Sequence, residues 1–302
     1  MLNFLPIAIF AYGLSGVTAV IDKILLKKSI PNPLAYVFFI STMGAILALF
    51  LMPFGVKLNF YSLLFAIISG VLGNFALLTY FQALKKGEAS IVAPIIGGAN
   101  PLFTLVIGSI FLGEILSPIQ LTAFFLLMLG AIILTYNLWA KKLQINHQLY
   151  LMILSGALFA LAYLMLREAF YASNFITGLV VSRLAGGMLV LPLLIYPVAR
   201  KEIFSGDIIK HDFLNKSSML MLLGQSFGAI SGFLIAYSVS IATPALVNSM
   251  FGFQYLVILL AALFLAHEHR SRLLDETLTK SALIQKIAGA GFLSFGVYLL
   301  SK

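Results

Sequence analysis

Cysteine is absent from the 302 residues of this chain, and charged residues are scarce at 10%. The first absence excludes disulfide bridges, thiolate metal sites and cysteine nucleophiles. The second excludes an ordinary soluble domain, because such domains carry about 25% charged residues to cover their surface. Hydrophobic residues make up 61% of the chain. A lipid bilayer is the solvent that fits this composition, since hydrocarbon removes the need for a charged shell.

The hydrophobic residues are grouped in long runs separated by short polar breaks. A helix that crosses a bilayer needs about 20 mostly apolar residues, and helices satisfy their own backbone hydrogen bonds inside lipid. The ten-residue alternation of membrane barrel strands is missing. We therefore predict an all-α integral membrane protein with ten transmembrane helices, at residues 4–26, 33–53, 60–84, 90–112, 118–138, 149–171, 175–197, 218–240, 244–265 and 283–300.

The order of the polar landmarks repeats along the chain. Asn32 precedes the second expected helix and Asn174 the seventh, while Glu114 follows the fourth and Glu268 the ninth. This order predicts two five-helix repeats, residues 1–140 and 149–302. An odd number of helices in each repeat forces the second copy into the inverted orientation. Inverted repeats around a midplane site are a common architecture of secondary transporters.

Four features between the third and fifth expected helices resemble the EamA domain of the drug/metabolite transporter superfamily: segment 80–90 (YFQALKKGEAS), Pro94, the pair 100–101 (NP) and segment 111–114 (FLGE). The resemblance extends over nearly the whole chain as two copies, of which the second matches less well. It implies ten helices in two inverted halves, a central cavity and transport of small metabolites. It also implies a multi-pass protein of the plasma membrane that works without a cofactor.

The net charge of +9 is explained by Lys and Arg in short loops, so we expect no nucleic-acid partner. Most of these basic residues fall in alternate loops, beginning with the loop between the first two helices. The positive-inside rule then places both termini outside. The family resemblance implies cytoplasmic termini, so the orientation stays open. We expect the bilayer and a small-molecule substrate as partners, and a monomer or a homodimer.

Arg183 lies near the middle of the seventh expected helix. An arginine at the bilayer centre costs about 2.5–3.5 kcal/mol on insertion scales, so it should face the bundle interior or a wet cavity. Its fixed fork of donors suits a carboxylate or phosphate on a substrate. The alternative is a structural ion pair with Asp22 or Glu168.

Amide side chains also fall inside the expected helices, and five of them are candidates for the substrate site. A buried amide without a partner costs about 1–3 kcal/mol, so these residues either line a polar path or join helices. We predict that they line the substrate path with Arg183, and interhelical hydrogen bonding is the alternative. The residues are Asn74, Asn100, Gln225, Asn248 and Gln254.

Four acidic residues are candidates for coupling or gating. Asp22 and Glu168 lie toward the ends of the first and sixth expected helices, where they serve either as proton carriers or as interfacial anchors. Glu114 and Glu268 end the fourth and ninth helices at matched positions, which favours a cap or a gate-side ion pair.

These features predict a secondary active transporter of small anionic or zwitterionic metabolites, such as amino acids, that works by alternating access. No Walker A pattern is present, so ATP is not the expected energy source. A flippase for a lipid-linked carrier is the second hypothesis. An intramembrane enzyme is the third, and the lack of a catalytic cluster or metal-ligand spacing argues against it. We therefore expect no enzymatic activity and no metal site.

Overall fold

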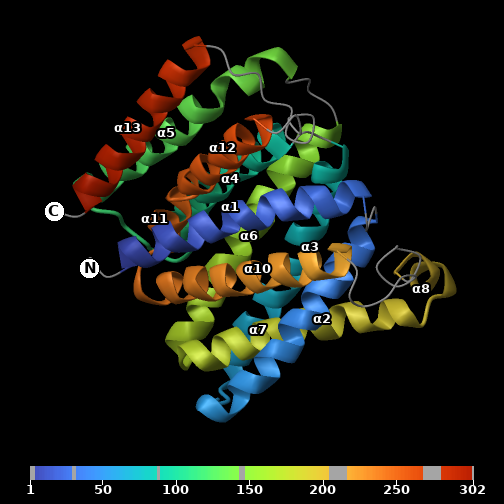
Figure 1. Cartoon of the computed structure of the whole chain (residues 1–302). Helices are drawn as coiled ribbons and strands as arrows, with labels where there is room; N and C mark the ends of the chain where they lie inside the picture. The colour runs from blue at the N-terminus through green and yellow to red at the C-terminus, as the bar shows by residue number, and fades with distance from the viewer. Residues whose placement is uncertain are drawn as a thin grey trace.

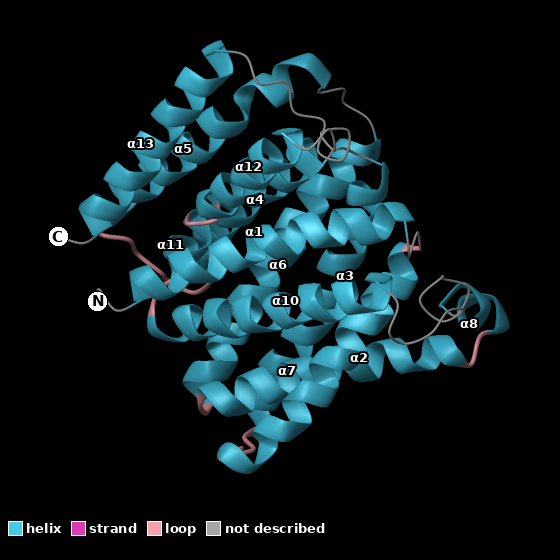
Figure 2. Cartoon of the chain, in the orientation of Figure 1, coloured by secondary structure: helices cyan, strands magenta, loops and turns pink. Residues whose placement is uncertain are grey.

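The computed structural model describes residues 4–28, 32–86, 89–142, 147–203, 216–267 and 280–300. All regular secondary structure in these ranges is helical (Figure 2). The helices are α1 (Phe4–Lys28), α2 (Pro33–Leu51), α3 (Phe60–Lys86), α4 (Ala89–Phe111), α5 (Pro118–Lys142), α6 (His147–Ala172), α7 (Phe175–Val190), α8 (Pro197–Ile203), α10 (Lys216–Ile241), α11 (Pro244–Ser249), α12 (Gly252–His267) and α13 (Lys280–Leu300). Most lie at expected positions, but the seventh expected helix, 175–197, ends at Val190, and α8 was not predicted.

Six of these helices are long and apolar enough to cross a membrane: α1, α2, α3, α6, α7 and α10. Shorter apolar stretches occupy the other expected positions, at Ile95–Phe111, Pro118–Ile133, Pro244–Ile258 and Ile287–Leu300. Both findings concern the described residues. The described residues are thus all-helical with six candidate membrane spans, and the expected count of ten spans is not confirmed.

Asparagine residues begin the second and seventh expected helices. The Asn32 side chain accepts a hydrogen bond from the Leu34 backbone nitrogen at 2.8 Å, and the Asn174 side chain accepts one from the Thr177 backbone nitrogen at 2.8 Å. Each bond satisfies a backbone donor that lacks a partner in the first turn of a helix. The repeated landmark in the sequence is therefore a repeated helix cap.

The ninth expected helix is divided into α11 and α12, which the sequence did not indicate. Between them the Phe251 backbone nitrogen donates to the Asn248 carbonyl at 3.1 Å, and the Gln254 nitrogen donates to the Phe251 carbonyl at 3.0 Å. Bonds to the third preceding residue tighten the turn. The Phe251 ring lies where a side chain at Gly97 of α4 would stand. This close approach brings α11 against α4.

Helices from the two halves of the chain pack against one another throughout the bundle (Figure 1). Pairs in contact are α1 with α10 and α12, α6 with α3 and α4, α2 with α7, α5 with α13, and α4 with α11. The described ends of α1 and α13 lie on the same side of the molecule in this view. Contacts within one half also occur, such as α2 with α3 and α6 with α7, but the most extensive contacts join the two halves, so the interior is shared by both.

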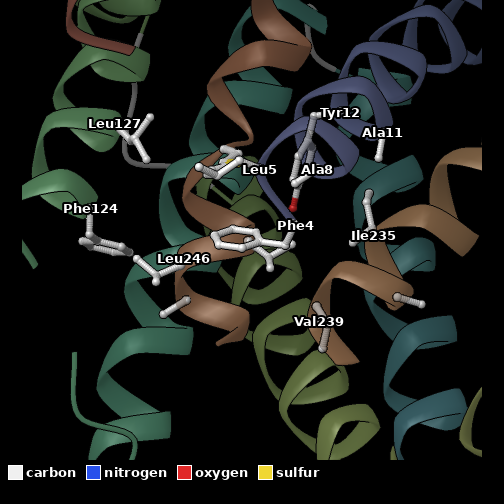
Figure 3. Packing of buried hydrophobic residues seen from close by; sticks show 14 of the residues in the cluster. Phe4, Leu5, Ala8, Ala11, Tyr12, Phe124, Leu127, Ile235, Val239 and Leu246 are labelled. Carbon is white, nitrogen blue, oxygen red and sulfur yellow. The ribbon is translucent and has the colours of Figure 1, made fainter. Parts of the chain in front are cut away.

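Apolar side chains of α1, α5, α10 and α11 form the larger buried cluster (Figure 3). Phe4 and Leu5 meet Phe124 and Leu246 in this cluster, and Tyr12 lies beside them with its hydroxyl group inside the bundle. A second buried cluster joins α1, α2, α3 and α4 around Tyr36 and Phe81. The two clusters pack along different parts of α1, so the buried residues Tyr12 and Asp22 of this helix are held within the bundle.

Candidate functional site

Arg183 projects from the middle of α7 into the space between three other helices. Its side-chain Cδ lies against Gly44 of α2, and its Nη2 atom lies against Gly232 of α10. Tyr163 of α6 interacts with it electrostatically. The residue nevertheless remains exposed. Arg183 therefore has neighbours on three helices but is not covered by them.

The expected alternative for Arg183 was an ion pair with Asp22 or Glu168. Neither pair forms, and within the described ranges no carboxylate lies within ion-pair distance of Arg183. The Tyr36 hydroxyl bonds Asp22 instead, at 2.5 Å. A guanidinium group has five N–H donors and cannot lose its charge in a protein. Arg183 is therefore a charged donor with capacity for an anion.

Asn100 and Asn248 meet at the contact between α4 and α11. The Asn248 Nδ2 atom donates to Asn100 Oδ1 at 3.2 Å and to Thr104 Oγ1 at 3.1 Å. The Tyr12 hydroxyl donates to Asn248 Oδ1 at 3.1 Å. Asn248 and Thr104 have no exposed surface, and Asn100 is buried. These amides join α1, α4 and α11 in this conformation, so they close the bundle at this level.

Asn74 and Gln254 are also bonded within the bundle. The Asn74 Nδ2 atom donates to the Gly186 carbonyl at 2.6 Å, and its Oδ1 accepts from Ser41 at 2.8 Å. This bridge joins α3 to α7 one turn beyond Arg183. Gln254 Oε1 accepts from Ser15 of α1 at 3.2 Å. Both amides are buried. The bonds of Asn74 join α2, α3 and α7, and the bond of Gln254 joins α12 to α1.

Gln225 differs from the other four amides. It is buried on α10, where its side chain interacts with the Tyr36 hydroxyl, yet its Nε2 atom has no well-formed hydrogen bond within the described part of the chain. A buried donor without a partner is costly and calls for an explanation. Gln225 lies two helical turns from Gly232, on the same helix that faces Arg183.

Glu114 forms an ion pair with Arg167 of α6, and the Tyr171 hydroxyl accepts from Arg167 Nε at 3.0 Å. Burial raises the pKa of Glu114, although the Arg167 guanidinium opposes this shift. Of the two roles expected for Glu114, a helix cap or an ion pair, the structure has the ion pair, with Arg167 as the partner. Glu168 is half-buried without an ion pair among the described residues. Glu268 lies outside the described residues.

Tyrosine residues are the part of the site that the sequence analysis missed. Tyr163 interacts electrostatically with both Arg183 and Tyr12, and Tyr80 interacts with Asp22. A tyrosine hydroxyl within an apolar run needs a polar partner once it is buried. That rule was a usable signal, since each of these hydroxyls faces one of the polar residues that the sequence did single out.

Comparisons with known proteins agree with this architecture. Residues 4–136 match the family model described as the EamA-like transporter family. An uncharacterized protein of Methanocaldococcus jannaschii is 31% identical over 130 residues, which cover 40% of this chain and 88% of the relative. A solved crystal structure of a protein 14% identical superposes with a TM-score of 0.62, covering 99% of this chain and 95% of the other, and this likeness supports the fold alone. The chain is a multi-pass membrane protein that belongs to the EamA-like transporter family.

Proposed function

We propose that this protein is a secondary active transporter of small anionic or zwitterionic metabolites, such as amino acids, and that Arg183 binds the acidic group of the substrate. The protein resides in the plasma membrane, acts as a monomer or homodimer, and performs no catalysis. The exposed guanidinium between α2, α6, α7 and α10 is the observation that carries the proposal. An unpaired arginine inside a membrane bundle is expensive, so a function must retain it.

An anion suits this position better than a cation or a neutral solute. The guanidinium fork forms two parallel hydrogen bonds with a carboxylate, at about 2.7–2.9 Å. No acidic group of the described residues competes for it. Tyr163, which interacts electrostatically with Arg183, adds a hydroxyl group near the guanidinium. A positively charged solute would meet only repulsion here.

The pattern of helix contacts supports ten spans in two inverted repeats, residues 1–140 and 149–302. A pseudo-twofold axis that relates α1 to α6 and α3 to α10 converts the α1–α10 contact into the α6–α3 contact. It likewise converts α4–α6 into the contact of α12 with α1. The α2–α7 and α5–α13 contacts lie on this axis. Arg183 of α7 lies near it, where alternating access places a substrate site.

The amide network at Asn100 and Asn248 then acts as a closed gate. It links helices that the proposed axis relates, and it has no exposed surface in this conformation. Opening the path on this side separates α4 from α11 and exposes amides that can bind passing substrate. Asn74 and Gln254 hold the neighbouring helices, and the Glu114–Arg167 pair closes the outer end of α4.

The test begins with profiles of metabolites in cells and medium, with and without the protein, to find transported solutes. Uptake of each solute into proteoliposomes is then measured for wild type, Arg183→Gln and Arg183→Lys. Loss of a charge-assisted hydrogen bond pair of about 1.5–3 kcal/mol predicts a 10- to 100-fold loss of uptake for Arg183→Gln. Arg183→Lys retains the charge without the fork and should recover part of it.

The exposed Arg200 on α8 provides the matched control, since Arg200→Gln removes the same charge outside the bundle. Gel filtration and melting temperature in detergent check that each variant is folded. The proposal fails if a folded Arg183→Gln protein transports every identified anionic solute at the wild-type rate.

A further inference from the structure

A second polar site surrounds Asp22 on α1. This carboxyl is only 6% exposed, and the Tyr36 hydroxyl of α2 donates to its Oδ1 atom at 2.5 Å. Tyr36 has no exposed surface. Tyr80 of α3 interacts with Asp22 electrostatically. Three helices therefore enclose one carboxyl group, and hydroxyl groups are its nearest described polar neighbours.

Two buried polar atoms at this site lack a well-formed hydrogen bond. The Tyr255 hydroxyl on α12, which interacts electrostatically with Tyr80, has no hydrogen bond to any described residue. Gln225 Nε2 on α10 has no well-formed hydrogen bond to a described residue, although its side chain interacts with the Tyr36 hydroxyl. Both residues are more than nine-tenths buried. Such atoms are satisfied in another conformation, by water or by a second rotamer. Entry of water into this site, in a conformation other than the one described, would supply the missing hydrogen bonds.

No cation in the described structure neutralises Asp22. Lys23 is its neighbour in sequence, but successive helix residues project about 100° apart. The Lys23 Nζ atom donates to the Leu84 carbonyl of α3 at 3.0 Å. Arg183 lies beside Gly232 of α10, and no ion pair joins it to Asp22 among the described residues. An ionised carboxylate that is dry and unpaired is strongly unfavourable, so the neutral acid suits this enclosed position.

The spacing along α10 separates Asp22 from the Arg183 site. Gly232 faces Arg183, and Gln225 faces Tyr36, the partner of Asp22. These seven positions correspond to about 10 Å along a helix. In an α-amino acid a single carbon atom separates the ammonium and carboxylate groups. A substrate bound through its carboxylate at Arg183 therefore does not reach Asp22, and the two charges serve different ligands.

We propose that Asp22 is the proton-binding site that drives transport: its carboxylate takes up one proton where the α1–α2–α10 contact is open to water, and releases it on the other side. This inference rests on the proposed transport function. In the closed state the neutral acid is held by Tyr36. When α1 and α2 part, water reaches Asp22, Gln225 and Tyr255, and the carboxyl ionises. Uptake converts one carboxylate and one proton into one acid, with no other reactant.

A proton fits this site better than a metal cation. Ca²⁺ requires six to eight oxygen ligands, and Mg²⁺ requires near-octahedral geometry. No group of three acidic or histidine side chains occurs within the described part of the chain. The hydroxyl of Tyr36 already donates to Asp22 Oδ1, so a metal ion would be left with a single carboxylate oxygen, Oδ2. A single buried carboxyl with one donor is sufficient for a proton.

Infrared difference spectra of the protein in lipid vesicles, recorded across a pH titration without any substrate, test the site directly. Because burial also raises the pKa of Glu114, all spectra are recorded in the Glu114→Gln background. The carboxylic acid C=O band of a buried acid should disappear there with rising pH, and Asp22→Asn should lack it. Glu168→Gln is the matched control and should keep it. Tyr36→Phe removes the donor to the ionised form, so the titration midpoint should rise by about one pH unit. If Asp22→Asn does not fold, the shift of the titration midpoint in Tyr36→Phe still tests the inference.

Absence of cysteine from the chain allows a second readout. Ala19 is buried one turn before Asp22 on α1, and Ala19→Cys reports whether water-soluble thiol reagents reach this level. The labelling rate of Ala19→Cys with Asp22 intact is divided by its rate in the Asp22→Asn background at the same pH. This ratio removes the effect of pH on ionisation of the thiol itself. It should be near one at acid pH and rise about tenfold or more at alkaline pH.

A C=O band that survives in Asp22→Asn, a midpoint that does not move in Tyr36→Phe, or a labelling ratio independent of pH would overturn the inference. None of these measurements uses a substrate. Their failure therefore leaves the role of Arg183 untouched, and failure of the Arg183 transport test leaves a positive titration of Asp22 standing.

Discussion

Substituting alanine at Gly70 of α3 tests how closely α3 and α7 must approach to position Arg183. A methyl group there would overlap the Ser182 carbonyl oxygen and lie 3.1 Å from the Gly186 backbone nitrogen. Both atoms belong to the α7 backbone, on either side of Arg183. Backbone atoms cannot rotate away as a side chain does, so the two helices must separate.

The magnitude follows from two opposing effects. Alanine in a helix interior is favoured over glycine by about 0.5–1 kcal/mol. Overpacking of a close contact costs about 1–3 kcal/mol, and a backbone contact belongs at the upper end of that range. We expect Gly70→Ala to lose about 2 kcal/mol of stability. Gly73→Ala, one turn later on the same helix, meets no atom within 4 Å and should gain up to about 1 kcal/mol.

The assay is the melting temperature of each variant in detergent, measured beside uptake into proteoliposomes. Gly70→Ala should melt several degrees below wild type and lose most of its uptake, because α7 carries Arg183 outward. Gly73→Ala should match or exceed wild type in both. Equal melting temperatures for the two variants would refute the packing argument.

Three further predictions concern buried polar groups. Because burial raises the pKa of Glu114, the folded protein binds its proton more tightly than the unfolded chain, so stability falls as the pH rises from about 4.5 through the raised folded value. Glu114→Gln should remove this dependence in melting curves, whereas Arg167→Gln should destabilise by about 1–2 kcal/mol at neutral pH. Gln225→Leu removes a donor without a well-formed hydrogen bond, so it should raise thermal stability by about 1 kcal/mol while impairing uptake. Asn248→Ala leaves the Tyr12 hydroxyl without its described partner and removes one bond each from Asn100 and Thr104, which remain bonded to each other. It should cost about 1–3 kcal/mol in the same melting assay, and an unchanged melting temperature would contradict the network.

The helices were predictable from the sequence because lipid demands long apolar runs and the caps mark their ends. Asn32 and Asn174 begin helices for a local reason that the sequence displays. The position of Arg183 inside the bundle follows from the cost of an arginine in hydrocarbon. These inferences depend only on residues close in sequence or on the properties of the lipid solvent.

Long-range pairings were beyond the sequence. The break between α11 and α12 depends on the Phe251 ring lying over Gly97, which only the packed bundle reveals. The same holds for Arg167, whose partner Glu114 lies 53 positions away. Asn100 and Asn248 were expected either on the substrate path or in hydrogen bonds between helices, but neither their pairing nor the hydroxyl from Tyr12 was predicted.

The most direct measurement compares the affinity of the purified protein for a transported anion with its affinity for the uncharged methyl ester of the same compound. The account predicts that wild type binds the anion about 10- to 100-fold more tightly, as expected for a charge-assisted bond pair of about 1.5–3 kcal/mol. In Arg183→Gln this preference should vanish, while affinity for the ester stays unchanged. A preference for the anion that survives in Arg183→Gln would contradict the central claim.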